Sequence, residues 1–262
     1  MDMRPCSVAG MFYPAEPRHL EQLLETFFQK KAPGIDARGI VSPHAGYVYS
    51  GETGACAFST IPPDFDGTFV VIGPSHRGYM TCASAVPWET PLGIVDVDTE
   101  FVNALDIEID EISHRSEHSI EVQMPFIKYR FPRARVAPVL MGDQRYEAAA
   151  RLAEKMIEAI ERTGTNVRIV ASSDFSHYVP DKTARLHDLH VIEALRTLNI
   201  PEFYRRLQET GATVCGYGPI ATMCIACRSL GATRGELLRY TTSGDVTEDF
   251  DQVVGYAAIA VV

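Results

Sequence analysis

This 262-residue sequence lacks the features that define several classes of protein. No stretch reaches the roughly 18 consecutive apolar residues that a membrane-spanning helix requires, so we expect no such helix. The first residues contain no basic segment followed by an apolar run, which argues against a secretory signal. We therefore expect a soluble, cytoplasmic protein without a membrane partner.

Clustered positive charge is also missing. The formal net charge is −10, and the nearest approach to a basic cluster is Arg130, Arg133 and Arg135, a mix that is common at the solvated end of a helix. Nucleic-acid backbones and anionic membrane surfaces attract basic proteins, so we expect neither as a partner. A small molecule or a peptide is the expected ligand.

The six cysteines have no spacing that suggests a disulfide framework. Cys224 and Cys227 form a single CxxC pair, without the second Cys or His pair that a zinc site of this kind needs. We therefore expect most of the cysteines to pack in the core as small hydrophobic residues.

The chain has no internal repeat, low-complexity tract or linker, so we interpret residues 1–262 as a single domain. Runs of apolar and β-branched residues predict strands that are buried on both faces, at 38–42, 67–73, 135–141, 166–172 and 253–262. A further strand-like run lies at 235–242. Helical periodicity predicts helices at 17–31, 117–130, 144–163, 181–197 and 217–230. This alternation predicts an α/β fold with a central, mostly parallel sheet flanked by helices, and with the last two strands added antiparallel at one edge.

Three of the eight histidines lie in short loops directly after predicted strands. These are His44, His76 and His177. Ligands of open α/β sheets bind beyond the carboxyl ends of the strands, so histidines at three such ends indicate one shared pocket. The three side chains can meet only if their strands are neighbours in the sheet.

Two further elements carry reactive side chains. Cys215 lies just before the N-terminus of a predicted helix, where the helix dipole favours a thiolate that serves as a nucleophile or as a metal ligand. His118 and Glu121 are three residues apart and share one helix face. The alternatives are a buried, inert cysteine and an ordinary ion pair at the helix start.

The sequence resembles the Memo family. The matching motifs occur in family order along nearly the whole chain: AGMFYP, SPHAGYVYSG, VIGPSHRG, EHSIEVQMPF, PVLMGD, SSDFSHY and VCGYGPI. The resemblance implies a fold like that of the class III extradiol dioxygenases. Archaeal and bacterial relatives are often grouped with an AMMECR1-like protein and a radical-SAM protein, which implies a functional association with them.

The resemblance also implies a set of site residues. The family's metal-binding histidines correspond to His44 and His76, and its pocket cysteine corresponds to Cys215. The dioxygenases hold iron with two histidines and a glutamate, so the cysteine would stand in place of that glutamate. Further pocket positions of the family correspond to Asp174, His177 and Phe12, where the animal protein has tryptophan in place of the phenylalanine.

Our first hypothesis is metal-dependent redox chemistry. Two imidazoles and a thiolate suit iron(II) or copper, and also zinc, and they leave positions open for other ligands. His177, oriented by Asp174, would transfer protons, and His118 would be a second such group or would support a ligand. The other predicted ligand-binding residues are Phe12, Tyr47, Tyr217 and Glu121.

Two hypotheses from other functional classes stay open. In the first, the pocket binds an anionic peptide or metabolite through protonated histidines and loop amides, without turnover; the animal protein is described as a binder of phosphotyrosine peptides. In the second, the protein is a hydrolase with Cys215 as nucleophile and His177 or His118 as base. The hydrolase leaves His44 and His76 without a role.

Overall fold

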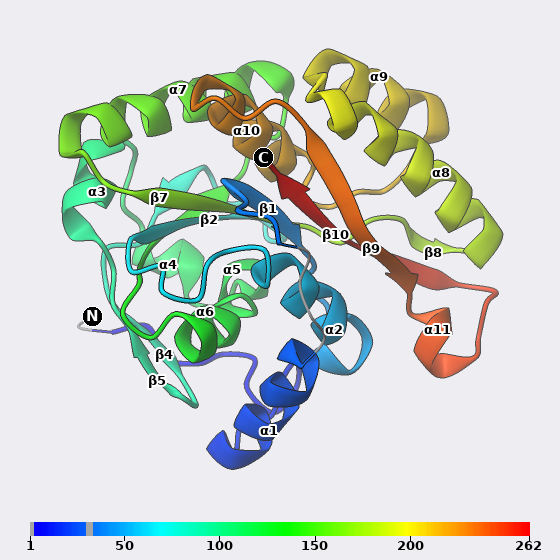
Figure 1. Ribbon diagram of the computed structural model, residues 1–262, viewed down its shortest axis with the longest axis horizontal. Coiled ribbons are helices and arrows are strands. Elements are labelled where there is room, and N and C mark those ends of the chain that lie inside the picture. Colours follow the sequence, from blue (N-terminus) through cyan, green and yellow to red (C-terminus); the bar gives the residue numbers. More distant parts are fainter. Residues whose placement is uncertain (1–2, 30–33) are drawn as a thin grey trace.

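The computed structural model describes residues 3–29 and 34–262 and has three layers, with a central sheet between two groups of helices (Figure 1). The strands are β1 (Gly39–Ser42), β2 (Thr68–Pro74), β3 (Cys82–Ala83), β4 (Trp88–Thr90), β5 (Gly93–Val95), β6 (Arg135–Met141), β7 (Val167–Ser172), β8 (His177–Val179), β9 (Gly235–Thr242) and β10 (Val253–Val261). Each strand predicted from the sequence is present, with both ends within one residue of the prediction.

The large sheet has the order β3-β6-β2-β7-β1-β10-β8, and β9 pairs with β10. The four strands β6, β2, β7 and β1 are parallel to one another, and their residues are almost all buried. Both β1 and β9 pair with β10 in antiparallel orientation. These pairings confirm the predicted mostly parallel sheet with an antiparallel addition at one edge. The short strands β4 and β5 form a separate pair.

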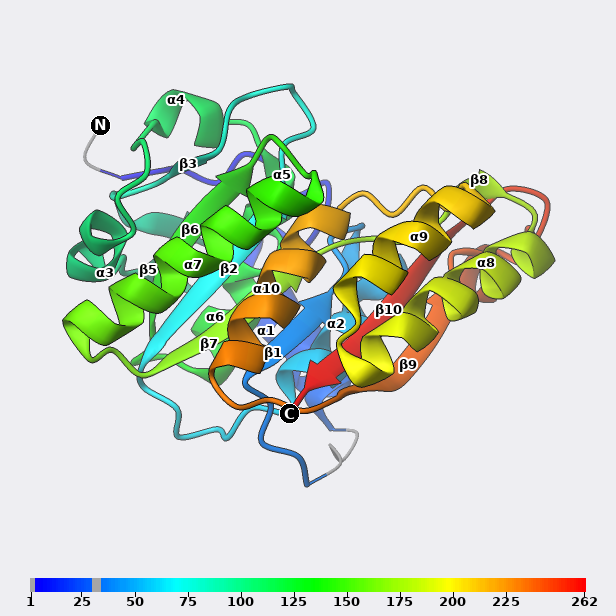
Figure 2. The same ribbon diagram turned by 90° about the horizontal axis from the view of Figure 1, so that it is seen from above.

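Helices cover both faces of the sheet. The elements are α1 (Pro17–Phe28), α2 (Tyr47–Phe58), α3 (Thr99–Ala104), α4 (Glu111–His114), α5 (His118–Glu121), α6 (Met124–Arg130), α7 (Tyr146–Thr163), α8 (Asp181–Glu193), the 3₁₀ helix η1 (Ala194–Thr197), α9 (Ile200–Thr210), α10 (Tyr217–Ser229) and α11 (Gly244–Thr247). One face carries α7, α8, α9 and α10, and the other carries α1, α2 and α6 (Figure 2). None of the described helices is both long enough and apolar enough to cross a membrane.

Several helices differ from the predictions, and α3, α4, α9 and α11 were not predicted. The single helix predicted at 117–130 is broken into α5 and α6, because Pro125 begins a new helix and has no backbone N–H to continue the old one. The helix α2 was missed, because its sequence contains glycines, aromatics and Val, which are weak helix formers. Packing against α1, β1 and β10 compensates for this weakness. The predicted helix at 17–31 ends at Phe28, and its positions 30 and 31 lie outside the described residues.

The sheet order brings the predicted site together. The strand β7 lies between β1 and β2, so the three strands that precede His44, His76 and His177 are direct neighbours. Because they are parallel, their carboxyl ends meet at the same edge of the sheet. The three histidines could meet only if their strands were neighbours in the sheet, and the observed strand order satisfies this condition.

A close contact at Gly73 fixes the distance between β2 and α5. A Cβ atom added at this position would run into Oγ of Ser119 and would lie 2.7 Å from Cγ1 of Ile120. The short helix therefore lies directly on the strand. The loop that leaves β2 and carries His76 thus begins at a fixed distance from α5.

Replacing Gly73 with alanine should lower the free energy of unfolding by about 1–3 kcal/mol, the usual cost of overpacking. Urea unfolding measures this change. Gly34→Ala is the matched control, because an added Cβ there meets no atom within 4 Å, and it should shift stability by less than about 0.5 kcal/mol. Equal stability of the two variants would contradict the close packing of β2 and α5.

Candidate metal centre

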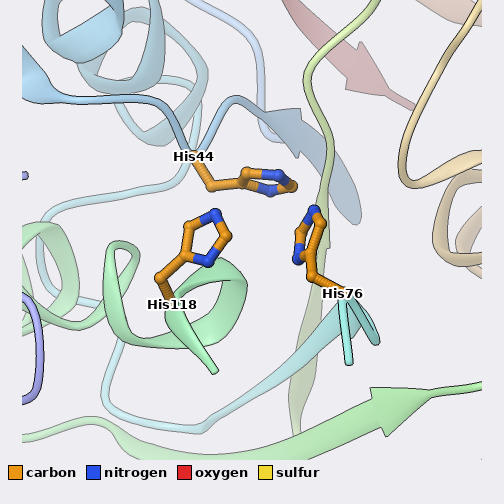
Figure 3. A group of neighbouring side chains, drawn as sticks. All are labelled: His44, His76 and His118. Atoms are coloured by element: carbon orange, nitrogen blue, oxygen red, sulfur yellow. The ribbon is translucent and has the colours of Figure 1, made fainter. Parts of the chain in front are cut away.

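Three imidazole rings from distant parts of the chain meet at this edge of the sheet (Figure 3). A nitrogen from each of His44, His76 and His118 lies within 4.8 Å of the other two. The ring of His44 is nearly perpendicular to both other rings, at centroid distances of 5.2 and 5.3 Å, whereas His76 and His118 stack at 4.5 Å. Within residues 3–29 and 34–262, this is the group of His, Cys, Asp and Glu side chains whose spacing suits a metal ion.

His44 follows β1 and is held in one tautomer. Its Nδ1 lies 2.9 Å from Oγ of Ser172, and that hydroxyl donates its hydrogen to the carbonyl of Ser119 at 2.6 Å. The hydroxyl must therefore accept from Nδ1–H of His44, which leaves Nε2 with a free lone pair. Burial lowers the pKa of His44 well below its usual range, and His118 and His76 lower it further. The ring is neutral and ready to act as a ligand through Nε2.

His76 follows β2 and is oriented by Glu117. Its Nδ1 lies 2.9 Å from Oε1 of Glu117, and its backbone N–H donates to Oε2 at 2.9 Å. An ionised carboxylate only accepts, so Nδ1 carries the hydrogen and Nε2 is free. A carboxylate behind a histidine in this way is the usual support for a metal ligand.

The same carboxylate reaches the third ring. Oε1 of Glu117 lies 3.4 Å from Nδ1 of His118, whose other side packs against Phe12 at a centroid distance of 4.8 Å. Burial and the neighbouring His76 lower the pKa of His118 to about 4. Burial alone would raise the pKa of Glu117, but hydrogen bonds from His76 and from the backbone of Ser119 outweigh it and bring the pKa to about 2.

The spacing of the three rings fits a metal ion after a small closure. Two bonds of about 2.1 Å at a tetrahedral angle separate their ligand atoms by roughly 3.3–3.5 Å. The present separations of up to 4.8 Å exceed that span, so the rings would have to move together by on the order of 1 Å. His76 and His118 are 34% and 25% exposed, which leaves them room for this movement.

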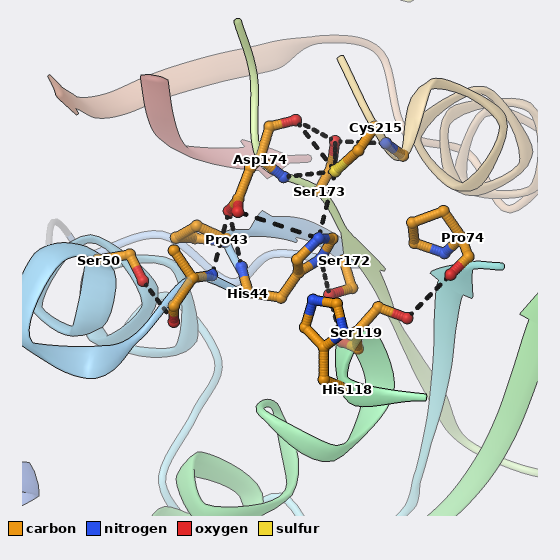
Figure 4. Close-up of polar contacts among 12 residues, drawn as sticks. Pro43, His44, Ser50, Pro74, His118, Ser119, Ser172, Ser173, Asp174 and Cys215 are labelled. Carbon is orange, nitrogen blue, oxygen red and sulfur yellow. Dashed lines mark hydrogen bonds and ion pairs between the residues drawn. The ribbon is translucent and has the colours of Figure 1, made fainter. Parts of the chain in front are cut away.

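Cys215 lies beside His44 rather than inside the group of three rings (Figure 4). Its Sγ is 3.2 Å from Nε2 of His44 and accepts a hydrogen bond from the backbone N–H of Asp174 at 3.2 Å. Burial raises the pKa of the thiol, and the carboxylate of Asp174 raises it further. Burial and Asp174 therefore act against the predicted thiolate. The sulfur still reaches the ligand atom of His44.

Asp174 and His177 occupy the edge of the site. Oδ1 of Asp174 accepts from the backbone N–H of His44 at 2.8 Å, and burial raises the pKa of Asp174 to about 6. His177 is oriented by Thr213 rather than by Asp174 as predicted: its Nδ1 lies 2.9 Å from the carbonyl of Thr213, and its backbone N–H donates to the Thr213 hydroxyl at 2.8 Å. A carbonyl accepts only, so Nε2 of His177 is free to exchange a proton.

Two predicted ligand-binding tyrosines lie apart from the three rings. The hydroxyl of Tyr47 donates to the carbonyl of Val122 at 2.7 Å, and its side chain is buried. Tyr217 lines a separate cavity together with Tyr204. Phe12, by contrast, contacts His118 directly.

Glu121, also predicted to bind ligand, is fully buried and ties the N-terminal segment to α5. It forms an ion pair with Arg4 at 2.7 Å and accepts from the Tyr13 hydroxyl at 2.7 Å and from the backbone of Ser7 and Val8 at 2.9 Å. These bonds hold the turn that carries Phe12 against the site.

The supporting residues of the site were not predicted from the sequence. Glu117 was not among the predicted site residues, and it is the N-cap of α5 as well as the partner of two rings. Ser172 and Gln123 fix His44 through a chain of hydrogen bonds, with Nε2 of Gln123 donating to Oγ of Ser172 at 2.9 Å. The only sequence signal for Glu117 was its position next to His118.

The CxxC pair behaves as expected. Cys224 and Cys227 are fully buried in α10, and burial raises the pKa of each thiol. Neither belongs to the group of side chains whose spacing suits a metal ion. They pack as small core residues.

Known proteins match this chain over nearly its whole length. The family model of the Memo-like proteins matches residues 4–260. A MEMO1 family protein of Methanosarcina barkeri is 44% identical and covers 99% of this chain and all of its own length, and one of Archaeoglobus fulgidus is 45% identical over 98% of each chain. A third, from Methanothermobacter thermautotrophicus, is 40% identical over 99% of this chain. Matches of this extent, together with the motifs that line the three-ring site, mean that this chain belongs to the Memo family.

Proposed function

We propose that this protein binds a redox-active metal, iron(II) or copper, between His44 and His76, and that it acts as a metal-dependent oxidoreductase on a small molecule. The observation that carries the proposal is the buried charge of Glu117. This carboxylate is fully buried, and its side-chain partners among the described residues are the rings of His76 and His118.

The sign of this charge favours a cation in the site. A buried carboxylate is costly unless it is paired and hydrogen-bonded, and its hydrogen bonds leave its negative charge in place. A metal ion held by Nε2 of His76 would complete the pairing, since the carboxylate lies directly behind that ring. The same charge disfavours the alternative function of binding an anionic peptide or metabolite, because the neutral rings of His44 and His118 bring no positive charge.

The donor set fits the proposed metals. His44 and His76 each present a free Nε2, and the third ligand would be Cys215, as the family resemblance implies, or His118, which lies in the three-ring group. Nitrogen and sulfur ligands suit iron(II), copper and zinc. Iron or copper bound there would supply electron transfer or activation of dioxygen.

The chain's own residues would handle the proton. His177 keeps its Nδ1 on the Thr213 carbonyl and has Nε2 free, so it can donate or accept a proton at one defined atom. Asp174, whose pKa of about 6 lies close to neutrality, is a second group that can change its protonation there. Phe12 packs against the ring of His118 at the edge of the site.

Replacing His44 with alanine should abolish metal binding, because it removes one of the two free Nε2 atoms. Protein purified without a chelating tag should contain about one iron or copper per chain by elemental analysis, and the His44→Ala variant almost none. His19→Ala is the matched control, since His19 is an exposed histidine of α1. Equal metal content in the His44→Ala variant and the wild type would rule the site out.

Replacing Glu117 with glutamine should weaken metal binding by about 10–100-fold, because the supporting carboxylate of His76 is lost. Competition with a chelator of known affinity measures the change. Glu16→Gln is the matched control: Glu16 is also an N-cap glutamate whose side chain accepts a backbone N–H, but it caps α1, away from the site. An affinity loss of the same size in both variants would mean that capping alone matters.

A cysteine-dependent hydrolase is the second candidate, because Sγ of Cys215 lies 3.2 Å from a histidine whose other nitrogen is fixed. The base would then be His44 rather than the His177 or His118 considered from the sequence. Alkylation of Cys215 and removal of metal by a chelator distinguish the two candidates. We expect that chelation abolishes oxidoreductase activity and that adding iron or copper back restores it. Activity that survives chelation and is lost on alkylation would favour the hydrolase.

A further inference from the structure

A cavity of about 520 Å³ lies where the start of α7, the end of α9 and the start of α10 come together. Its size is in the range of small-molecule sites, roughly 300–1,000 Å³. The His44, His76 and His118 rings do not line it. Thr213 lines this cavity and also orients His177, whereas none of the proposed metal ligands lines it.

Three tyrosines form its walls. The rings of Tyr146 and Tyr204 are 5.9 Å apart at 86°, and those of Tyr204 and Tyr217 are 5.8 Å apart at 88°. The middle ring is fixed, because the Tyr204 hydroxyl donates to the carbonyl of Gln144 at 2.7 Å. Each ring is therefore set nearly at a right angle to the next, and together they make an aromatic corner around the cavity.

The charges around the cavity favour a positive ligand. Glu147 lines the cavity and has no ion-pair partner among the described residues. Arg145 also lines it, but its guanidinium is paired with Asp143, with Nε–Oδ1 at 3.0 Å and Nη2–Oδ2 at 2.6 Å. Asp143 does not line the cavity, but it neutralises Arg145, so the net charge of the three side chains is −1. The faces of aromatic rings attract cations as well.

We propose that this cavity is a binding site for a small organic cation of the alkylammonium class. The cationic head would lie against the tyrosine rings and Glu147, in the arrangement by which aromatic cages recognise quaternary ammonium groups. An apolar part would pack on Leu207 and Val214, which complete the wall. An anionic ligand would meet the unpaired carboxylate, so the site selects by charge.

The cavity also borders the segment that carries Cys215. The side chain of Gln144 donates to the Cys215 carbonyl at 2.9 Å and accepts from the backbone of Gly218 at 2.8 Å, and the Tyr204 hydroxyl holds the backbone of Gln144. The site nevertheless stands apart from the proposed metal chemistry, because the head group contacts none of the metal-site residues. Failure of either proposal leaves the other intact.

Calorimetric titration with choline and with its neutral isostere 3,3-dimethylbutan-1-ol tests the site, because the two differ in charge and hardly in shape. Choline should bind at least about tenfold more tightly, the size of an effective cation–π contribution. Equal affinity of the two compounds, or no choline binding at millimolar concentration, would overturn the proposal.

Two variants locate the binding. Tyr146→Leu should weaken choline binding severalfold, and folding is not at risk, because this side chain is 39% exposed. Glu147→Gln should weaken choline but not the neutral isostere. Tyr178→Leu, which removes a tyrosine that is 72% exposed and does not line the cavity, is the matched control and should bind as the wild type does. Unchanged choline affinity in both Tyr146→Leu and Glu147→Gln would exclude this cavity as the site.

Discussion

The candidate site depends on one buried carboxylate. Glu117 accepts hydrogen bonds from the ring and the backbone of His76, faces the ring of His118 and caps the start of α5 through Ser119. A single group thus decides where the helix begins and how two of the three rings are turned. Because its side chain is fully buried, its negative charge acts on the site with little screening by water. The preference of the site for a cation is therefore set by the same group that shapes it.

The N-terminal segment is fixed to the site by a second buried charge. Glu121 lies one helical turn after Glu117 and binds Arg4, Ser7 and Tyr13. The first part of the chain therefore lies against α5, and Phe12 is placed over His118. The two carboxylates of this short helix therefore have different roles. Glu117 orients the histidine rings, and Glu121 holds the N-terminal segment that places Phe12 against His118.

The sequence was sufficient for the parts of this arrangement that follow from local patterns. Continuous apolar runs predicted the buried strands, and the rule that ligands bind beyond the carboxyl ends of parallel strands placed His44, His76 and His177 at one edge. Both patterns are local in the chain, and the order of the strands in the sheet brings the carboxyl ends of β1, β2 and β7 together.

The rest depended on contacts between distant residues. The role of Glu117 was hidden, because an acid at a helix start is an ordinary cap until another loop brings His76 against it. The dipole argument for a thiolate at Cys215 considered only the local helix, whereas burial and Asp174, which the fold brings against the sulfur, both raise the thiol pKa. Similarly, Asp174 is the nearest acid to His177 in sequence, yet Thr213 from another segment orients that ring. In each case the deciding neighbour is remote in the sequence.

The contact at Gly73 has a consequence for how the site can rearrange. Because β2 lies directly against α5, the strand and the helix cannot come closer together at this point without a clash. The rings of His76 and His118, which stack at 4.5 Å, would therefore turn toward a common ligand by rotation of their own side chains, and not by a shift of the strand against the helix.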